Sequence, residues 1–320
     1  MTRPLVLIAS PALAEANNGN WQTAWRWSRL LAPRYCTQIV PSWQPGEQPQ
    51  AVALLALHAR RSADVIAAWA QAHPGRGLAV VLTGTDLYRD IQRDAAAQRS
   101  LALAQRLVVL QELGPQALPA EHRAKTRVIF QSTTPRRTLD KTGKHLRAVM
   151  VGHLREEKGP QTLWAAARLL RDRPDIRIDH IGDALDPALG EAAQAAMADC
   201  PAYRWLGGLP HEAVRRHIQR AHLLVHCSRM EGGAHVLMEA ACSGTPVLAT
   251  RIAGNVGMLG ADYAGYFPVD DAAALAGLLQ RCRDAPDRVL ALRAQCSLRA
   301  PLFAPAAEQA ALLALLQDLI

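Results

Sequence analysis

Glu231-Gly-Gly-Ala-His-Val-Leu-Met-Glu239 connects a short apolar run, Leu223–His226, to a segment of helical character at residues 234–242. This order of buried strand, glycine turn and helix is the repeating unit of α/β folds. Gly232 and Gly233 allow the backbone to approach a ligand closely. The free N–H groups of a first helical turn favour an anion. We therefore expect a diphosphate-containing ligand to bind at this turn.

The same stretch carries an acid at each end. Glu231 and Glu239 can accept hydrogen bonds from the hydroxyl groups of a sugar or a ribose. Two acids around a glycine pair at a strand-to-helix turn are typical of nucleotide-sugar sites. Taken alone, the spacing better fits a helix cap by Glu231 and an exposed helical acid at Glu239. The other motifs of the chain favour the nucleotide-sugar site.

Composition limits the class of protein. The chain has 320 residues, of which 50% are hydrophobic and 5% aromatic, so it can form two globular domains with separate cores. Its formal net charge of +8 favours a small anionic substrate or nucleic acid. The densest basic stretch, residues 136–147, contains Asp140 and no aromatic residue. We interpret it as a solvated linker and do not expect nucleic acid as a partner.

The cysteines and the N-terminus indicate the compartment. Six cysteines are scattered without a Cys-x-x-Cys pair, which is typical of reduced thiols and not of a zinc site or a disulfide framework. The apolar run Leu5–Ala9 is shorter than the roughly 7 to 15 apolar residues of a secretory signal. No segment reaches the roughly 20 apolar residues of a membrane span. We expect a cytoplasmic protein without a membrane partner.

Short apolar runs alternate with amphipathic runs along the chain. The first series runs through Leu5–Ala9, Trp21–Leu31, Val52–Leu57, Ala63–Ala72, Leu78–Leu82, Asp94–Gln105 and Leu107–Leu110. The second series runs through Leu146–Val151, Pro160–Leu170, Ile176–Ile181, Pro187–Ala198, Tyr203–Leu206, Glu212–Arg220, Leu223–His226, Val247–Ala249 and Tyr266–Val269. Such alternation predicts parallel sheets covered by helices, with ligands at the carboxyl ends of the strands.

The two series predict two doubly wound, Rossmann-like α/β domains that face a central cleft. We expect the boundary in the basic stretch, which gives a first domain at residues 1–140 and a second at 141–303. The segment 304–320 is rich in alanine and leucine and follows a break at Pro301 and Pro305. It is expected to form a helix that packs back toward the first domain.

A basic motif follows the first strand of the second series. In Val151-Gly-His-Leu-Arg-Glu-Glu-Lys-Gly159, Arg155 and Lys158 can neutralise a diphosphate. The alternative is a surface loop in which these cations pair with Glu156 and Glu157. Because two motifs follow strands of one predicted domain, we favour the diphosphate.

Two loops of the first domain carry polar groups. Asn17-Asn-Gly-Asn-Trp21 follows the first strand and can donate to an anion or a sugar, although an ordinary helix cap is the alternative. Thr83-Gly-Thr-Asp86 also ends a strand, and its alternative is a cap formed by Asp86. Candidates for binding a second, anionic substrate are Asn18, Gly19, Asn20, Thr85 and Arg89.

Other signals are weaker. Gly254-Asn-Val-Gly257 is a further strand-end loop, in which Asn255 is a candidate substrate contact. No Asp-x-Asp follows a strand and no histidines have metal spacing, so we expect a reaction without metal or cofactor. Four histidines are acid–base candidates, and the last of them lies inside the acidic motif: His58, His153, His226 and His235.

At this point the second domain resembles the family 4 retaining glycosyltransferases of GT-B fold. The resemblance lies in Val151–Gly159, Ile181–Asp183, Leu206–Gly207, Glu231–Glu239 and Gly244–Val247. It implies that the catalytic residues are Glu231, Lys158 and Arg155. It also implies a donor site formed by His153, Gly182, Leu206, Gly232, Gly233, Ala234, His235, Val236 and Glu239.

In this resemblance Glu231 contacts the donor hexose, Glu239 holds the ribose and Lys158 grips the diphosphate. The chain departs from the family at two places. The arginine that usually follows Gly152 is His153 here, so its role passes to Arg155. The histidine usual in the first domain is absent near residues 83–86, which argues against ordinary acceptor chemistry.

More narrowly, the chain is similar to the bacterial group that contains the selenosugar synthases of selenoneine biosynthesis. This similarity covers both domains, through Asn17–Thr23, Leu82–Ile91, Gln131–Ser132, Glu231–Val236 and Gly254–Gly260. It implies a UDP-N-acetylglucosamine or UDP-glucose donor, selenophosphate as the selenium source, and a 1-selenosugar, UDP and phosphate as products. It also implies a functional link to a selenophosphate synthetase and to a downstream selenoneine-forming enzyme.

Two alternatives remain at the level of sequence. A conventional glycosyltransferase with an oxygen acceptor would share every donor-domain residue, so only the first domain distinguishes it. An anion pocket at Asn18, Asn20 and Arg89 favours selenophosphate, whereas an apolar groove there would favour a lipid or glycan acceptor. A non-catalytic nucleotide-sugar-binding protein is the second alternative. The presence of Glu231, Glu239 and Lys158 together argues against it.

Overall fold

A computed structural model describes residues 3–12 and 19–320 of the chain. The chain forms two compact units. The first comprises Met1–Ser132, Glu231–Gly233 and Leu302–Ile320, and the second comprises Thr133–Met230 and Ala234–Pro301. The expected boundary at residue 140 therefore lies within the second unit. Asn17 and Asn18 of the predicted polar loop lie outside the described residues.

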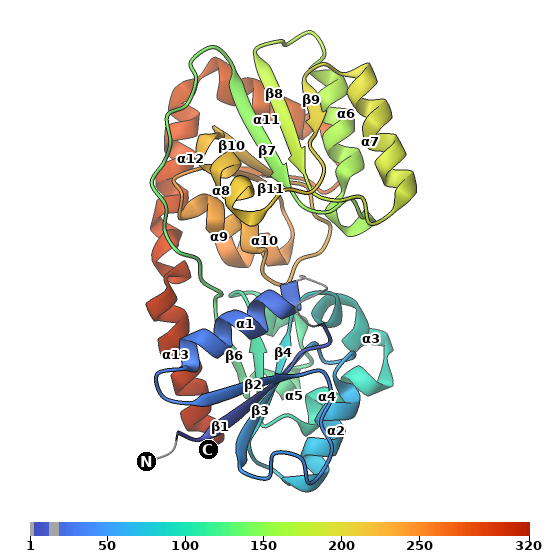
Figure 1. Cartoon of the computed structure of the whole chain (residues 1–320). Coiled ribbons are helices and arrows are strands. Elements are labelled where there is room, and N and C mark those ends of the chain that lie inside the picture. Colours follow the sequence, from blue (N-terminus) through green and yellow to red (C-terminus); the bar gives the residue numbers. More distant parts are fainter. Residues whose placement is uncertain (1–2, 13–18) are drawn as a thin grey trace. The chain divides into compact units, whose positions relative to one another are not determined.

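The first unit contains a six-stranded parallel sheet (Figure 1). Its strand order is β2 (Cys36–Val40), β1 (Leu5–Ala9), β3 (Ala51–Leu57), β4 (Leu78–Leu82), β5 (Arg106–Val109) and β6 (Thr126–Val128). The helical elements are α1 (Gly19–Leu31), α2 (Ala63–Ala72), η2 (Asp86–Asp90), α3 (Ile91–Arg93), α4 (Ala95–Leu103), η3 (Gly114–Ala117), α5 (Ala120–Arg123) and α13 (Pro305–Leu319).

Helices cover both faces of this sheet because its central strands are apolar on both sides. All five residues of β4 are buried, as expected for a parallel strand between two layers. Leu7 and Ala9 pack in one core cluster with residues of α2 and α4. Val6 and Ile8, which alternate with them, pack in another cluster with residues of α1 and α13.

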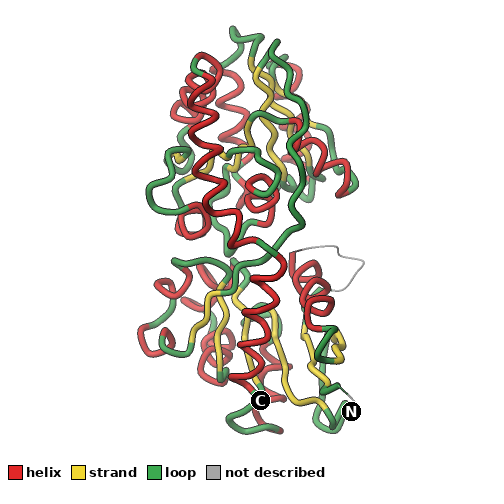
Figure 2. Tube along the Cα trace, turned by 90° about the vertical axis from the view of Figure 1, so that its left-hand side faces the viewer, coloured by secondary structure: helices red, strands yellow, loops and turns green. Residues whose placement is uncertain are grey.

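The last helix is fixed to the first unit by a buried carboxylate. Helix α13 packs against α1, and its course to the C-terminus is visible in Figure 2. Glu308 of α13 is 1% exposed and accepts hydrogen bonds from Arg26 Nε at 2.9 Å and from Trp27 Nε1 at 2.7 Å. The backbone N–H of Ser132 donates to the same carboxylate at 2.8 Å. Loss of α13 would remove this carboxylate and leave the donor groups of Arg26, Trp27 and Ser132 without their acceptor.

The second unit contains another six-stranded parallel sheet. Its strand order is β12 (Tyr266–Phe267), β11 (Val247–Thr250), β10 (Leu223–His226), β7 (Leu146–Val151), β8 (Ile176–Ile181) and β9 (Tyr203–Trp205). The helices are η4 (Glu156–Lys158), α6 (Pro160–Leu169), α7 (Pro187–Asp199), α8 (His211–Arg220), α9 (His235–Ala241), α10 (Ala253–Leu259), α11 (Ala272–Asp284), α12 (Pro286–Arg299) and η5 (Ala300–Phe303), the last of which spans the division between the units.

These two sheets confirm the predicted α/β class with two doubly wound domains. The six cysteines are all free thiols, and five of them are buried. Among the helices of residues 3–12 and 19–320, none is long and apolar enough to cross a membrane.

Candidate functional site

In the second unit, at the carboxyl edge of the sheet, the basic motif packs against the loop that follows β10 and leads into the acidic motif. Gly159 ends the basic motif with a left-handed φ of +61°, and a Cβ there would lie 2.5 Å from the carbonyl oxygen of Cys227. Only glycine allows the loop after β7 to pack so closely against the loop after β10. The backbone N–H of Arg229 also donates to the carbonyl oxygen of Glu157 at 2.9 Å. The parallel strands thus bring the basic motif next to residues 227–229, which directly precede the acidic motif.

Gly182 and Leu206 lie at the same edge, after β8 and β9. A Cβ on Gly182, which has φ +153°, would lie 2.0 Å from the carbonyl oxygen of Gly152. The glycine is therefore required for contact between the ends of β7 and β8. The backbone N–H of Leu206 donates to the carbonyl oxygen of His180 at 2.8 Å, which continues the ladder between β9 and β8.

Lys158 and Arg155 of the basic motif differ in their surroundings. The Lys158 side chain is partly buried and lies over the end of β7, where its Cδ is 3.5 Å from the Cβ position on Gly152. The Arg155 side chain is exposed. The geometry therefore holds Lys158 at the strand end, while the Arg155 side chain extends into solvent.

His153, which stands beside Lys158, has a defined tautomer. Its Nδ1 accepts a hydrogen bond from the backbone N–H of Asp183 at 3.3 Å, so the ring proton lies on Nε2. Burial, with the charges of Arg155 and Lys158, lowers the pKa of His153, although Asp183 acts in the opposite direction. The ring is therefore neutral at pH 7 and presents a neutral N–H donor.

Glu239 is a buried carboxylate held by three basic side chains. Its Oε1 lies 2.7 Å from His211 Nε2, 3.4 Å from His235 Nδ1 and 3.5 Å from Arg215 Nη1. Burial alone would raise the pKa of Glu239, but the hydrogen bonds from His211 and His235 and the charge of Arg215 lower it well below its usual range. The site therefore contains a fixed negative charge.

Sequence reasoning missed His211 and Arg215. Both lie on α8, one helical turn apart, and not in a strand-end loop. Arg215 is 2% exposed and donates to Thr133 Oγ1 at 2.6 Å and to Thr134 O at 3.0 Å. Its Nε is buried without a partner among the described residues. The only sequence signal was the i, i+4 spacing of two basic residues on an amphipathic helix.

The acidic motif is divided between the two units. Glu231–Gly233 groups with the first unit, whereas Ala234, His235 and Val236 begin the second unit's helix α9. A Cβ on Gly232 would lie 2.4 Å from the carbonyl oxygen of Thr83. The glycine pair is therefore needed for packing, in addition to any role in ligand binding.

In the first unit, the buried His58 and the partly buried Thr85 form a pair at the ends of β3 and β4. His58 is 3% exposed and adopts a left-handed φ of +74°, which costs a residue with a Cβ about 1 kcal/mol or more. Its Nδ1 accepts from the backbone N–H of Arg61 at 3.3 Å, so Nε2 carries the proton. Nε2 lies 3.2 Å from Thr85 Oγ1 and donates to it. His58 was only one of four histidine candidates in the sequence, because its backbone strain is not readable there.

Asp86 links the same two loops. Its carboxylate is fully buried and accepts from the backbone N–H groups of Thr83 and Gly84 at 2.9 Å each, and of Ala59 at 3.0 Å. Its role is structural, but it is not the helix cap that the sequence offered as the alternative, since the N-cap residue is Thr85 and no side chain caps the helix. Asp86 begins η2, a π-helix, which is a geometry frequent at functional sites. Arg89 within it contacts Asp90 at 3.2 Å, so its charge is partly compensated.

The remaining acceptor candidates belong to different units. Gly19 and Asn20 begin α1, where the carbonyl oxygen of Gly19 accepts from Thr23 Oγ1 at 2.8 Å. Asn255 lies in the second unit, fully buried, and its Nδ2 donates to the carbonyl oxygen of Thr250 at 2.9 Å. Its Oδ1 has no partner among the described residues. A role of Asn255 in substrate binding stays a prediction.

Metal-ligand geometry is not found in the described part of the chain. No three His, Cys, Asp or Glu side chains within residues 3–12 and 19–320 form a group that could hold a metal ion. Whether the reaction needs a metal stays a prediction of the sequence.

Comparison with known proteins identifies a family and a fold. Residues 131–297 match the family described as glycosyl transferases group 1. The structure of sucrose-phosphate synthase from Thermosynechococcus elongatus aligns with a TM-score of 0.77 and 17% identity over 99% of each chain. HepE of Anabaena in complex with UDP aligns with a TM-score of 0.72 and 15% identity over 100% of each chain.

A second HepE structure, in complex with UDP-glucose, aligns with a TM-score of 0.72 and 14% identity over 98% of this chain and 100% of that one. At these identities the likeness concerns the fold, and it confirms the predicted GT-B architecture. A search of curated proteins finds no match to the sequence.

Proposed function

This chain belongs to the glycosyl transferases group 1 family, and from that premise we propose that it transfers a hexose from a UDP-sugar to selenophosphate. The hexose is N-acetylglucosamine or glucose, and the products are a 1-selenosugar, UDP and phosphate. The donor class is supported by the HepE structures, which hold UDP and UDP-glucose. The acceptor is supported by the resemblance of both domains to selenosugar synthases.

The observation that carries the proposal is the ionised Glu239 at the same sheet edge as the basic loop after β7. A carboxylate fixed by His211 and His235 can accept hydrogen bonds from ribose hydroxyls without moving. Lys158, held over the end of β7, can neutralise the diphosphate. A donor that joins a ribose to a diphosphate requires this combination of charges.

The chemistry suits a small anionic acceptor. Selenophosphate attacks through selenium, a soft nucleophile that is already anionic, so no strong general base is needed. A selenium lone pair forms the C–Se bond at the anomeric carbon while the C–O bond to UDP breaks. Lys158 stabilises the charge that develops on the leaving diphosphate. Water then cleaves the P–Se bond, which releases phosphate and leaves a selenol on the sugar.

The acceptor end is assigned to Thr85 and His58. Because His58 Nε2–H donates to Thr85 Oγ1, the Thr85 hydroxyl directs its own proton elsewhere and can donate it to an anion. Burial lowers the pKa of His58, although Asp86 opposes this, so the ring stays neutral at pH 7. In this assignment His58 is a positioning residue that acts through Thr85. The loop then offers a hydroxyl donor in place of the base that an oxygen acceptor would need.

Mass spectrometry of the reaction tests the proposal directly. The purified chain is incubated with UDP-N-acetylglucosamine or UDP-glucose, with and without enzymatically generated selenophosphate. The expected result is a selenium isotope pattern on a hexose, with UDP released only when selenophosphate is present. UDP-sugar binding without that product would instead indicate a conventional glycosyltransferase with an oxygen acceptor. Absence of UDP-sugar binding would refute the donor assignment as well.

A further inference from the structure

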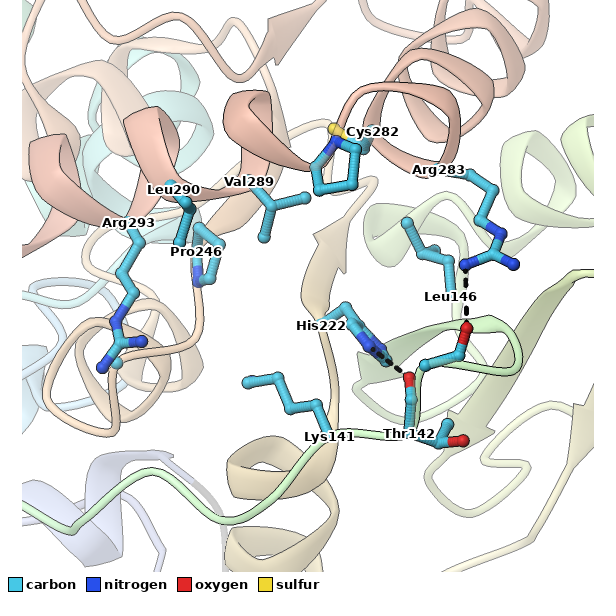
Figure 3. Close-up of a pocket in the computed structure, with 13 residues that line it drawn as sticks. Lys141, Thr142, Leu146, His222, Pro246, Cys282, Arg283, Val289, Leu290 and Arg293 are labelled. Atoms are coloured by element: carbon cyan, nitrogen blue, oxygen red, sulfur yellow. Dashed lines mark hydrogen bonds between the residues drawn. The ribbon is translucent and has the colours of Figure 1, made fainter.

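The second unit contains a cavity at the edge opposite to its predicted donor site. The cavity has a volume of about 400 Å3 (Figure 3). Leu146 begins β7, His222 precedes β10 and Pro246 precedes β11, and all three line it. Val289 and Leu290 line it from α12. Because the strands are parallel, this amino edge is separated by the length of the sheet from the loops that hold Lys158 and Glu239.

Part of the lining is apolar and open to solvent. Leu290 keeps 59% of its surface exposed, and Leu146, Pro246 and Cys282 present buried apolar surface behind it. Figure 3 shows Val289 and Leu290 extending from α12, with Leu290 beside Pro246. An apolar ligand group placed there would remove the Leu290 side chain from water, which favours binding.

The charged part of the lining is entirely basic: it consists of Lys141, Arg283 and Arg293. Arg283 is neutralised, because its Nε pairs with Asp175 Oδ2 at 2.8 Å. Lys141 and Arg293 form no ion pair with a carboxylate of the described residues. Lys141 donates to the carbonyl oxygen of Ala221 and lies 3.5 Å from Thr245 Oγ1. Arg293 Nη2 donates to Thr138 Oγ1 at 3.3 Å.

A partly buried ammonium without a carboxylate partner is electrostatically unfavourable. Burial, and then the charge of Arg293, lower the pKa of Lys141 to about 8. Burial and the nearby charge of Arg293 have the same origin: two cations lie beside an apolar cavity without a counterion. A bound anion would compensate Lys141 and Arg293 together.

We propose that this cavity binds a small amphipathic anion, a carboxylate with an apolar tail. The carboxylate lies between Lys141 and Arg293, and the tail packs on Val289 and Leu290. This site is separate from the glycosyl transfer site, and the inference does not rest on the proposed reaction. Since such a ligand binds only the folded chain, it also raises the thermal stability.

Sodium octanoate is the probe, measured by isothermal titration calorimetry on the full chain. Acetate has the same head without the tail, and octanol has the tail without the charge. Saturable octanoate binding that raises the Tm is expected, with acetate and octanol at least about tenfold weaker. Octanol binding as tight as that of octanoate would refute an anion site, and so would absence of saturable octanoate binding.

Variants locate the site on the chain. Arg293 is exposed, so its substitution should not disturb the fold. Arg293→Gln and Lys141→Gln are each expected to weaken the binding of octanoate about tenfold. Arg216→Gln, an equal charge change at an exposed position of α8 outside the lining, is the matched control and should leave it unchanged. Octanoate affinity should also fall as the pH rises above about 8, where Lys141 loses its proton. Equal weakening by Arg216→Gln and Arg293→Gln would show non-specific attraction and overturn the proposal.

Discussion

The carboxyl edges of the two sheets hold buried acids by different means. In the second unit, Glu239 is surrounded by His211, His235 and Arg215, so its charge is balanced by other side chains. In the first unit, Asp86 is bound by three backbone N–H groups. The Glu239 carboxylate is therefore part of a network of charged side chains, whereas the Asp86 carboxylate holds two loops together.

The difference indicates that Glu239 is suited to binding a ligand and Asp86 to fixing the positions of neighbouring residues. A carboxylate balanced by side chains at a strand-end site can still accept hydrogen bonds from a ligand. A carboxylate saturated by backbone N–H groups fixes the positions of His58 and Thr85 instead. The acidic motif connects the two cases, because Glu231 groups with the first unit and Glu239 with the second.

The largest effect is expected from the acid that groups with the first unit. Glu231→Gln removes the charge that the family resemblance assigns to the donor hexose, and we expect turnover to fall by about 10³-fold or more. The fold should be retained, because the substitution is nearly isosteric. Steady-state kinetics with circular dichroism measures both. Glu156→Gln, an exposed acid of the basic motif, is the control, and equal turnover in the two variants would remove Glu231 from the site.

Paired substitutions of the two buried acids test the comparison itself. Asp86→Ala leaves three N–H groups without their acceptor, and at about 1–3 kcal/mol for a buried unpaired group we expect a large fall in Tm. Its affinity for UDP should stay near that of the wild type. Glu239→Gln should weaken UDP binding about tenfold or more, since the fixed charge is lost and one of the two acceptor oxygens becomes an NH2 donor.

Calorimetry of UDP binding and a thermal melt separate these outcomes. If Glu239→Gln changed only the Tm, both acids would be structural, and the contrast between the two edges would disappear.

The regular part of this molecule was predictable because its signals are local. Strand β4 consists of five buried apolar residues, so a short stretch of sequence is enough to predict it. Strand β2 is harder to predict, because it is an edge strand whose first four residues alternate between exposed and partly buried, and the sequence analysis omitted it. Helices α11 and α12 were omitted as well, since they follow the last motif and carry none.

Candidate site residues could be predicted only where they lie in a strand-end loop. The basic loop and the acidic motif were predicted in this way, and the structure packs Gly159 of the basic loop against Cys227, in the loop that leads to the acidic motif. His211 and Arg215 were missed because they contact Glu239 from helix α8, which precedes the acidic motif and is not part of a strand-end loop. The left-handed backbone of His58 depends on the packing of three loops, which no short window contains.

The His58–Thr85 pair gives a smaller, selective effect. His58→Asn tolerates the left-handed backbone but cannot donate at the same position, so we expect the KM for selenophosphate to rise about tenfold. The KM for the UDP-sugar should not change. Thr85→Val should act in the same way, and Thr85→Ser should restore the wild-type value. A purely structural role would lower the Tm of all three variants without separating the two KM values.

The smallest effect is the pH dependence of the free energy of unfolding. In the second unit it distinguishes the contribution of His180 from that of Glu239. His180 is fully buried between Tyr203 Oη at 3.0 Å and the carbonyl oxygen of Gly152 at 3.2 Å, and burial lowers its pKa to about 4. A histidine whose folded pKa is depressed contributes stability that is present above the unfolded pKa of about 6.5 and is lost as the pH falls toward 4.

At pH 5.5 this loss amounts to about 1 kcal/mol relative to pH 7.5. Glu239 does not contribute in that window, because its lowered pKa costs stability only as the pH falls below the ordinary carboxyl range. Urea unfolding at the two pH values, in the wild type and in His180→Gln, measures the difference. A smaller pH dependence in the variant is expected, since the glutamine does not titrate. An unchanged dependence would assign the acid sensitivity to other histidines whose pKa is lowered by burial, of which His58 in the first unit is the direct counterpart.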